Sequence, residues 1–488
     1  MKLRWLIALC VTFTLDHVAQ GEHFSDQRTK EIDRIIEARL VKTHIPGAAV
    51  VLVEGGRVVH ARGFGLADVE TETPVSSNTI FAIGSVSKSF VANALLQLER
   101  DGRISLDDPV VSHLPAFRSV TKKKSDTISI RQLMQHTSGF SMFDGNRHQT
   151  SRSRSEGTLA KVAAQTKRYR LNRPVGHSFE YSNANYEVLG NLLARVEGSS
   201  FEAIIENRIF KPLNMNRSGI LRDSDPETAT PYRFIFSKPE AFRFSPGSAL
   251  GPKGGVYTTA DDMGRYLIAL MDEHSAIASW EDYWASGSDM PIGATYGPGW
   301  MVFQSDFGPL AKHNGMNGGY SALAGFAPET GLGFAIMANA SQGMLAGDTS
   351  ALTEDAFAVA FDLPVPGLQD QRPALIQLIV VGAMLAGLMV WIGLFCRNAV
   401  TRRLSKSSTR WLGAAQLVLP GILLAAIAWM VLALIPRQFG LPIEAIRLFV
   451  PDIGWLLTLL GYGSICFLVA RSIALSLISN AQMRDDMS

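Results

Sequence analysis

Residues 81–90 read FAIGSVSKSF, and this stretch decides the fold because it joins a short apolar, strand-like segment to the start of a helix. The apolar spacing predicts a helix from Ser85 to Arg100. Ser85 would then lie in the first helical turn, where unpaired backbone N–H groups favour developing negative charge. Lys88 returns to the same face three residues later. A serine needs a base to remove its proton, and a lysine can serve if burial lowers its pKa.

The S-x-x-K pattern is weak on its own, because two common residue types at a fixed spacing recur by chance. It recurs in this chain at Ser119 and Lys122. That second copy lies among lysines in a polar stretch, and we expect it to be a solvated run of charge. The choice of Ser85 therefore rests on its place at a helix start and on the motifs that follow it.

Two further motifs follow in order along the chain. Tyr181-Ser182-Asn183 precedes a helical pattern, and His313-Asn314-Gly315 lies on an expected strand. Alone, the first would more often be a core tyrosine followed by a helix cap, and a purely structural sheet histidine remains the minor alternative for the second. All three motifs in suitable elements and in this order are unlikely to agree by chance.

The ordered triple resembles the serine β-lactamases and penicillin-binding proteins, in particular their class C and D-aminopeptidase branch. The resemblance extends over about residues 29–363. It includes the segments LMQHTSG at 133–139, GGVYTTADDM at 254–263 and GYSALAGFAPETGLGFAIMANA at 319–340. It implies a serine hydrolase that works through an acyl-enzyme.

The resemblance also implies the catalytic roles. Ser85 would be the nucleophile, and Lys88 and Tyr181 would share the general-base and general-acid roles. The backbone N–H groups of Ser85 and Met316 would form the oxyanion hole.

Other matched positions would bind substrate or hold the fold. Asn183 would bind a substrate amide, while His313 and Gly315 on the edge strand would help to orient the substrate. His136 and Asp262 resemble positions that maintain the fold rather than catalyse.

One departure from the family pattern bears on the substrate. Many penicillin-binding enzymes have Lys-Thr-Gly where this chain has His313-Asn314-Gly315. A fixed positive charge for a substrate carboxylate is thus replaced by a group that is mostly neutral near neutral pH. Family members with a histidine at this position include peptidases that act on D-residues, so the resemblance implies a peptidase acting on D-residue-containing peptides rather than an efficient β-lactamase.

The order of segments also resembles the membrane-bound, colibactin-type peptidases that remove an acyl-D-asparagine group from nonribosomal peptides. The agreement is in layout more than in the pocket. Ala82 stands where those enzymes have a glutamate, and Asn183 where they have a serine.

The fold class expected is α/β (α+β). A strand, a tight turn and a second strand are predicted from Pro46 onward, in the sequence PGAAVVLVEGGRVVHARGFG. Strand patterns return from Gly297 to Ala340. Mostly helical patterns lie between, and a last helix is expected at 348–363. We therefore expect one antiparallel sheet built from both ends of a domain at 22–365, flanked by helices and carrying a helical lobe.

The two ends of the chain predict export and a membrane anchor. Residues 1–21 have the basic start and short apolar run of a signal peptide. After a linker at 366–373, residues 374–470 hold three apolar stretches of spanning length, 374–395, 411–435 and 454–470, with a tail at 471–488. The first connection has five basic residues and no acid, which predicts a cytoplasmic loop. The domain would then lie outside the plasma (inner) membrane.

Composition excludes several other functions. A net charge of +2 gives no sign of a nucleic-acid partner, and no metal-binding cluster or phosphate loop is evident. We expect no cofactor, a small-molecule or peptide substrate, and contact with membrane lipid; a homodimer is left open. An esterase, a low-rate β-lactamase and a penicillin-binding receptor without turnover remain alternative functions.

Overall fold

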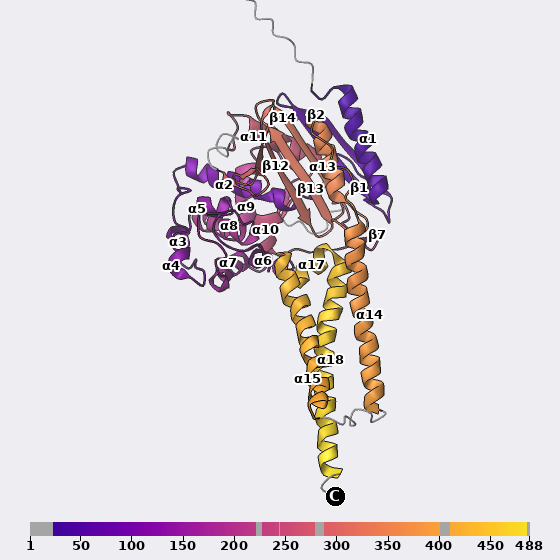
Figure 1. The fold of residues 1–488 in the computed structure, drawn as a ribbon. Coiled ribbons are helices and arrows are strands. Elements are labelled where there is room, and N and C mark those ends of the chain that lie inside the picture. Colours follow the sequence, from indigo (N-terminus) through magenta and orange to yellow (C-terminus); the bar gives the residue numbers. More distant parts are fainter. Residues whose placement is uncertain (1–22, 221–226, 244, 279–286, 401–409, 486–488) are drawn as a thin grey trace, which may run out of the picture.

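The computed structural model describes residues 23–220, 227–243, 245–278, 287–400 and 410–485. The expected signal peptide at 1–21 and most of the basic connection at 397–410 lie outside these residues. Figure 1 shows a domain of strands and helices from which long helices extend as a stalk.

A nine-stranded antiparallel sheet forms the centre of the domain, in the order β3-β2-β1-β14-β13-β12-β11-β10-β9. The β1–β2 hairpin from the start of the domain pairs with β14 from its end, with Val51 opposite Ala335. The strands are β1 (Gly47–Glu54), β2 (Arg57–Asp68), β3 (Thr73–Pro74), β9 (Ser288–Asp289), β10 (Thr295–Tyr296), β11 (Met301–Ser305), β12 (Gly308–Asn317), β13 (Tyr320–Ala327) and β14 (Leu332–Ala338). The predicted assembly from the two ends of the domain is confirmed.

Both faces of this sheet are covered, because successive side chains of a strand point to opposite sides. Val50 and Leu52 of β1 belong to one apolar cluster, whereas Val51 and Val53 belong to another. In the central strands β13 and β14, every residue is accordingly buried and most are apolar.

Helices from opposite ends of the domain cover the first face. α1 (Asp26–Thr43) packs against α13 (Thr349–Ala360), and Arg39 pairs with the buried Asp355 at 2.6 Å. On the second face, α11 (Ala260–Met271) lies across β1, β2 and β14. The helix expected at 348–363 is therefore present and slightly shorter.

The helical lobe lies beside this second face, as Figure 1 shows. Its helices are α2 (Ser87–Arg100), α3 (Val110–His113), α4 (Lys122–Ser125), α5 (Ile130–Met134), α6 (Met142–Gly145), α7 (Thr158–Ala163), η2 (Ala164–Arg168), α8 (Asn183–Glu197), α9 (Phe201–Ile205), η3 (Glu206–Phe210), η4 (Ser248–Leu250) and α10 (Gly251–Gly254). Small sheets join β4 (Phe81–Ala82), β8 (Val256–Thr258) and β5 (Gly219–Ile220), and β6 (Tyr232–Ile235) with β7 (Lys238–Ala241).

Within the part of the chain that the structure describes, three helices are long and apolar enough to cross a membrane, over Arg372–Arg397, Val418–Gln438 and Pro451–Leu477. They belong to α14 (Arg372–Val400), to the continuous run of α15 (Arg410–Trp429), the π-helical turn η6 (Met430–Leu434) and α16 (Ile435–Gln438), and to α18 (Pro451–Asp485). The third helix is much longer than the apolar stretch at 454–470. The short helix α17 (Ile443–Phe449), which we did not predict, precedes it.

Candidate active site

Ser85 lies in the 3-10 turn η1 (Gly84–Val86), which leads directly into α2. We expected the helix to begin at Ser85 itself; it begins two residues later. Gly84 has a φ of +51°, and a Cβ there would lie 2.4 Å from the backbone nitrogen of Met316. A Cβ on Gly315 would lie 1.9 Å from the carbonyl oxygen of Ile83. The two glycines therefore let β12 approach the turn that carries Ser85.

Lys88 is fully buried and its side-chain nitrogen has two partners. Its Nζ lies 3.0 Å from Ser85 Oγ and 2.7 Å from the carbonyl oxygen of Lys253. Burial, and then the charge of Lys253, hold the pKa of Lys88 well below its usual range, although Glu187 opposes this shift. The sequence pattern correctly placed Lys88 beside Ser85.

Tyr181 completes the polar contacts of Ser85, because its hydroxyl donates to Ser85 Oγ at 2.9 Å. Burial raises the pKa of Tyr181, so the phenol stays protonated. The segment is held by His136, whose Nδ1 accepts from the backbone N–H of Ser182 at 3.1 Å and from Asn185 Nδ2 at 2.9 Å. His136 thus maintains the position of Tyr181 without contacting Ser85.

His313 lies on β12 with both ring nitrogens engaged. A carbonyl oxygen can only accept, so Nδ1 donates to Asn314 O at 2.6 Å and Nε2 accepts from the hydroxyl of Tyr296 at 3.0 Å. Burial, and then Lys88, lower the pKa of His313 to about 3. Its ring is neutral at physiological pH.

Asn183 begins α8 and is almost fully buried. Its Nδ2 donates to Asn146 Oδ1 at 2.7 Å, while its Oδ1 is buried without a partner. Asn183 follows Tyr181, which contacts Ser85, by two residues. The Nδ2 of Asn183 already has a protein partner, whereas its Oδ1 has none.

The geometry agrees with comparisons to known proteins. The family model described as Beta-lactamase matches residues 32–356, which contain all the residues named above. The chain belongs to the beta-lactamase family. Within this family it is 28% identical over 324 residues to the protein Flp of Staphylococcus aureus (strain MRSA252), covering 64% of this chain and 62% of Flp. It is 30% identical over 308 residues to PbpX of Bacillus subtilis (strain 168), covering 62% of this chain and 73% of PbpX.

The chain is also similar to a solved structure. The octameric penicillin-binding protein homologue from Pyrococcus abyssi superimposes with a TM-score of 0.58 at 27% identity, over 69% of this chain and 78% of that one. The chain spans slightly less than two thirds of the length of Flp. The three apolar helices lie outside the segment matched by the beta-lactamase family model.

Sequence reasoning missed a buried ion pair near Lys88 in this beta-lactamase-family site. Lys253 Nζ contacts Glu187 Oε1, and both side chains are about 1% exposed. The available signal was a charged residue, Glu187, between Tyr186 and Val188 in a helix with many apolar residues. Lys253 directly precedes the GGVYTTADDM segment that we did single out. Tyr296, also missed, lies in a stretch without a motif.

The second S-x-x-K copy lies away from these groups. Ser119 hydrogen-bonds locally to Ser125 and Thr121, and Lys122 is exposed at the start of α4. The exposed Lys122 agrees with the expected run of solvated charge, whereas Ser119 itself is buried, at 3% exposure.

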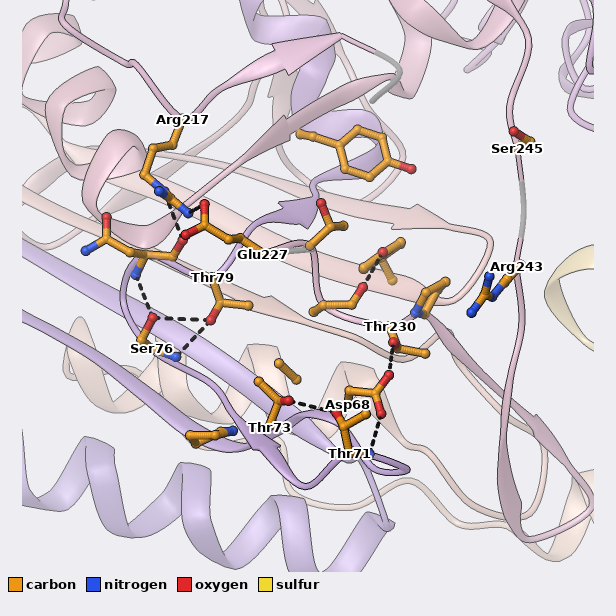
Figure 2. A pocket seen from close by; sticks show the side chains of 18 of the residues that line it. Asp68, Thr71, Thr73, Ser76, Thr79, Arg217, Glu227, Thr230, Arg243 and Ser245 are labelled. Atoms are coloured by element: carbon orange, nitrogen blue, oxygen red, sulfur yellow. Dashed lines mark hydrogen bonds and ion pairs between the residues drawn. The ribbon is translucent and has the colours of Figure 1, made fainter. Parts of the chain in front are cut away.

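A cavity of about 960 Å³ lies elsewhere in the domain, and neither Ser85, Lys88 nor Tyr181 is among its described lining residues. Figure 2 shows Asp68 hydrogen-bonded to threonines and Arg217 beside Glu227, whereas no interaction is drawn for Arg243. Asp68 accepts from Thr230 and Thr71, and Arg217 pairs with Glu227. Among the described residues, no group of three His, Cys, Asp or Glu side chains could hold a metal ion.

Proposed function

We propose that this protein is a membrane-anchored, extracytoplasmic serine hydrolase that works through an acyl-enzyme on Ser85. One observation carries the proposal: Ser85 Oγ lies within hydrogen-bond distance of both Lys88 Nζ, at 3.0 Å, and Tyr181 Oη, at 2.9 Å. A serine hydroxyl is a weak nucleophile unless a neighbouring base takes its proton, and Lys88 is buried where its neutral form is favoured.

The proton path follows from these contacts. In the neutral form, Lys88 accepts the Ser85 proton as Oγ attacks the substrate carbonyl, while it donates to the Lys253 carbonyl. Tyr181 keeps its proton and donates to Ser85 Oγ, so it is placed to protonate the leaving nitrogen, with Lys88 restoring its proton. Water then attacks the acyl ester by the reverse path and regenerates Ser85.

The backbone N–H groups of Ser85 and Met316 are the proposed oxyanion hole. The close approach of β12 to η1, at Gly84 and Gly315, supports this assignment because it brings the two backbones together. Two preorganised donors at the developing charge are a large source of rate acceleration in acyl transfer.

The neutral state of His313 supports a peptide substrate. The ring offers no positive charge to a substrate carboxylate, and the neighbouring Lys312 is paired with Glu354. We propose cleavage of amide bonds in D-residue-containing peptides, including removal of an acyl-D-amino acid group, with Asn183 binding a substrate amide and His313 and Gly315 orienting it. The alternatives are an esterase, a low-rate β-lactamase and a penicillin-binding receptor.

The anchor and the domain limits are also proposals. We place a signal peptide at 1–21, the hydrolase domain at 22–365, a linker at 366–373, a membrane region at 374–470 and a cytoplasmic tail at 471–488. Large apolar side chains exposed along the stalk support lipid contact, such as Ile379 at 60%, Val390 at 62% and Ile422 at 60%.

A fluorophosphonate probe should label the full-length protein in detergent, and the adduct should map by mass spectrometry to the peptide that contains Ser85. The matched control is Ser119, which has a lysine at the same spacing but no buried base. An adduct on the Ser119 peptide, or none at all, would contradict the assignment of the nucleophile.

Product analysis with four substrates separates the alternatives within the family. The panel comprises an ester, a cephalosporin, a D-aminoacyl amide and an acyl-D-asparagine peptide. The proposal expects fastest turnover of an amide that contains a D-residue. A stable adduct without turnover of any of them would favour the receptor.

The acylation rate is expected to rise with pH through the lowered pKa of Lys88, because only the neutral amine can take the Ser85 proton. His313 should add no step near pH 6.5, since its pKa is about 3. Fluorophosphonate labelling rates measured from about pH 5 to 10 test this. Lys88→Arg, which stays charged, should be slow throughout; a wild-type rate independent of pH would argue against Lys88 as the base.

A further inference from the structure

Asp452 of α18 contacts the domain by accepting from the backbone N–H of Phe236 at 2.7 Å. A second contact is made by residues 436–450, which we call the docking segment. It comprises the end of α16, a turn and α17. Leu441, Ala445, Leu448 and Phe449 form an apolar cluster with Phe242 of the domain. In Figure 1, α17 lies at the junction of the domain and the stalk.

The turn of the docking segment fits closely against α6 of the helical lobe. Gly440 has a φ of +65°, and a Cβ there would lie 2.6 Å from Met142 Sδ. Arg437 lies over the ring of Phe143 at 5.8 Å. The carbonyl oxygen of Gly440 accepts a buried hydrogen bond from Asn146 Nδ2 at 2.9 Å.

Asn146 links this contact to the candidate active site. Its Oδ1 accepts from Asn183 Nδ2 at 2.7 Å and from Gln149 Nε2 at 3.1 Å. Asn146 is 5% exposed, so water has little access to replace these partners. A two-bond relay thus runs from Gly440 through Asn146 to Asn183.

The chemistry of Gly440 fixes the direction of the whole relay. A backbone carbonyl can only accept, so Asn146 must present its NH₂ to Gly440 and its oxygen to Asn183. Asn183 must then donate, which turns its own Oδ1 away from Asn146. That oxygen is buried without a partner, and such an acceptor is costly unless another donor satisfies it.

We propose that the docking segment of the anchor helps to build the active site, and that Asn146 is a positioning residue through which the Gly440 carbonyl fixes the orientation of the Asn183 amide, whose buried, unpartnered oxygen is left to accept a substrate N–H. If the docking segment separates from α6, Asn146 and Asn183 can rotate together, and Asn183 would then present a donor instead. The inference rests on the proposed function for the place of Asn183 at the substrate and for the identity of the donor, an amide N–H of the substrate.

Two substitutions outside the reacting groups test the relay in the full-length protein in nanodiscs. Gly440→Val removes the close fit to Met142, and Asn146→Ala removes the link. The matched control is Gly382→Val in α14, where a Cβ would meet nothing within 4 Å. We expect Gly440→Val and Asn146→Ala each to slow hydrolysis of an N-acyl-D-aminoacyl p-nitroanilide about tenfold, the effect of one hydrogen bond. The double variant should be no slower than either single variant, because both break the same relay.

Labelling by a fluorophosphonate, which has no amide N–H, should change by less than about twofold in these variants. Hydrogen exchange should increase at residues 141–149 and 182–186 in Gly440→Val but not in Gly382→Val. Independent, multiplying effects of the two substitutions, or unchanged exchange at 182–186, would overturn the inference. Failure of the wild type to be labelled would instead overturn the proposed function. The relay would then be tested by the hydrogen-exchange measurement alone.

Discussion

Replacing Ser85 by alanine is expected to abolish fluorophosphonate labelling and to lower substrate turnover by about 10⁴- to 10⁶-fold. Neither Lys88 nor Tyr181 can substitute as the nucleophile, because Lys88 is fully buried and the phenol of Tyr181 stays protonated. The fold should persist, since Lys88 keeps its hydrogen bond to the Lys253 carbonyl. Single-turnover kinetics and the unfolding temperature measure the two effects separately.

Ser119→Ala is the control for this experiment, and it should leave labelling and turnover unchanged. Residual labelling of Ser85→Ala at a rate near that of the wild type would mean that another serine carries the chemistry. Loss of activity together with loss of folding would be visible as a lowered unfolding temperature.

Replacing Glu187 by alanine is expected to destabilise the domain by about 3–5 kcal/mol, because it leaves the buried ammonium of Lys253 without its partner. The effect should reach the active site, since Lys253 also supplies the carbonyl oxygen that holds Lys88. Thermal or urea unfolding of the full-length protein checks the stability, and the fluorophosphonate labelling rate checks the site.

Two comparisons make the Glu187 prediction specific. The exposed pair of Lys211 and Glu206, at 64% and 53% exposure, has the same charges, and Glu206→Ala should cost less than about 1 kcal/mol. The double variant Glu187→Gln with Lys253→Met should recover much of the lost stability, because neither buried charge then remains. Equal effects at the buried and exposed pairs would contradict the prediction.

Local patterns were sufficient for much of the fold. β1 and β14 could be predicted as strands because their apolar runs are bounded by glycine turns. Their pairing followed from the requirement that strands at both ends of a domain share one sheet. The contact of Ser85 with Lys88 was predictable because three residues bring two side chains to one face of a helix.

Contacts between distant segments could not be predicted in this way. The pairing of Lys253 with Glu187, and of Asn146 with Gly440, joins residues that no periodicity relates. The short helix α17 was missed because its sequence lies between two longer apolar stretches and is partly polar. The contact of α17 with the domain depends on Phe242, which is distant in the sequence and packs against it.

The position of β14 between β1 and β13 has a consequence for biosynthesis. The β1–β2 hairpin is made early but keeps an open edge until residues 332–338 leave the ribosome. An open edge can pair with other chains, and pairing across so long a separation is slow. α13 ends at Ala360 and α14 begins at Arg372, so the sheet is completed at about the time when the first apolar helix is synthesised. Ser85 is therefore synthesised early, whereas the complete sheet that supports it forms only after β14 has been made.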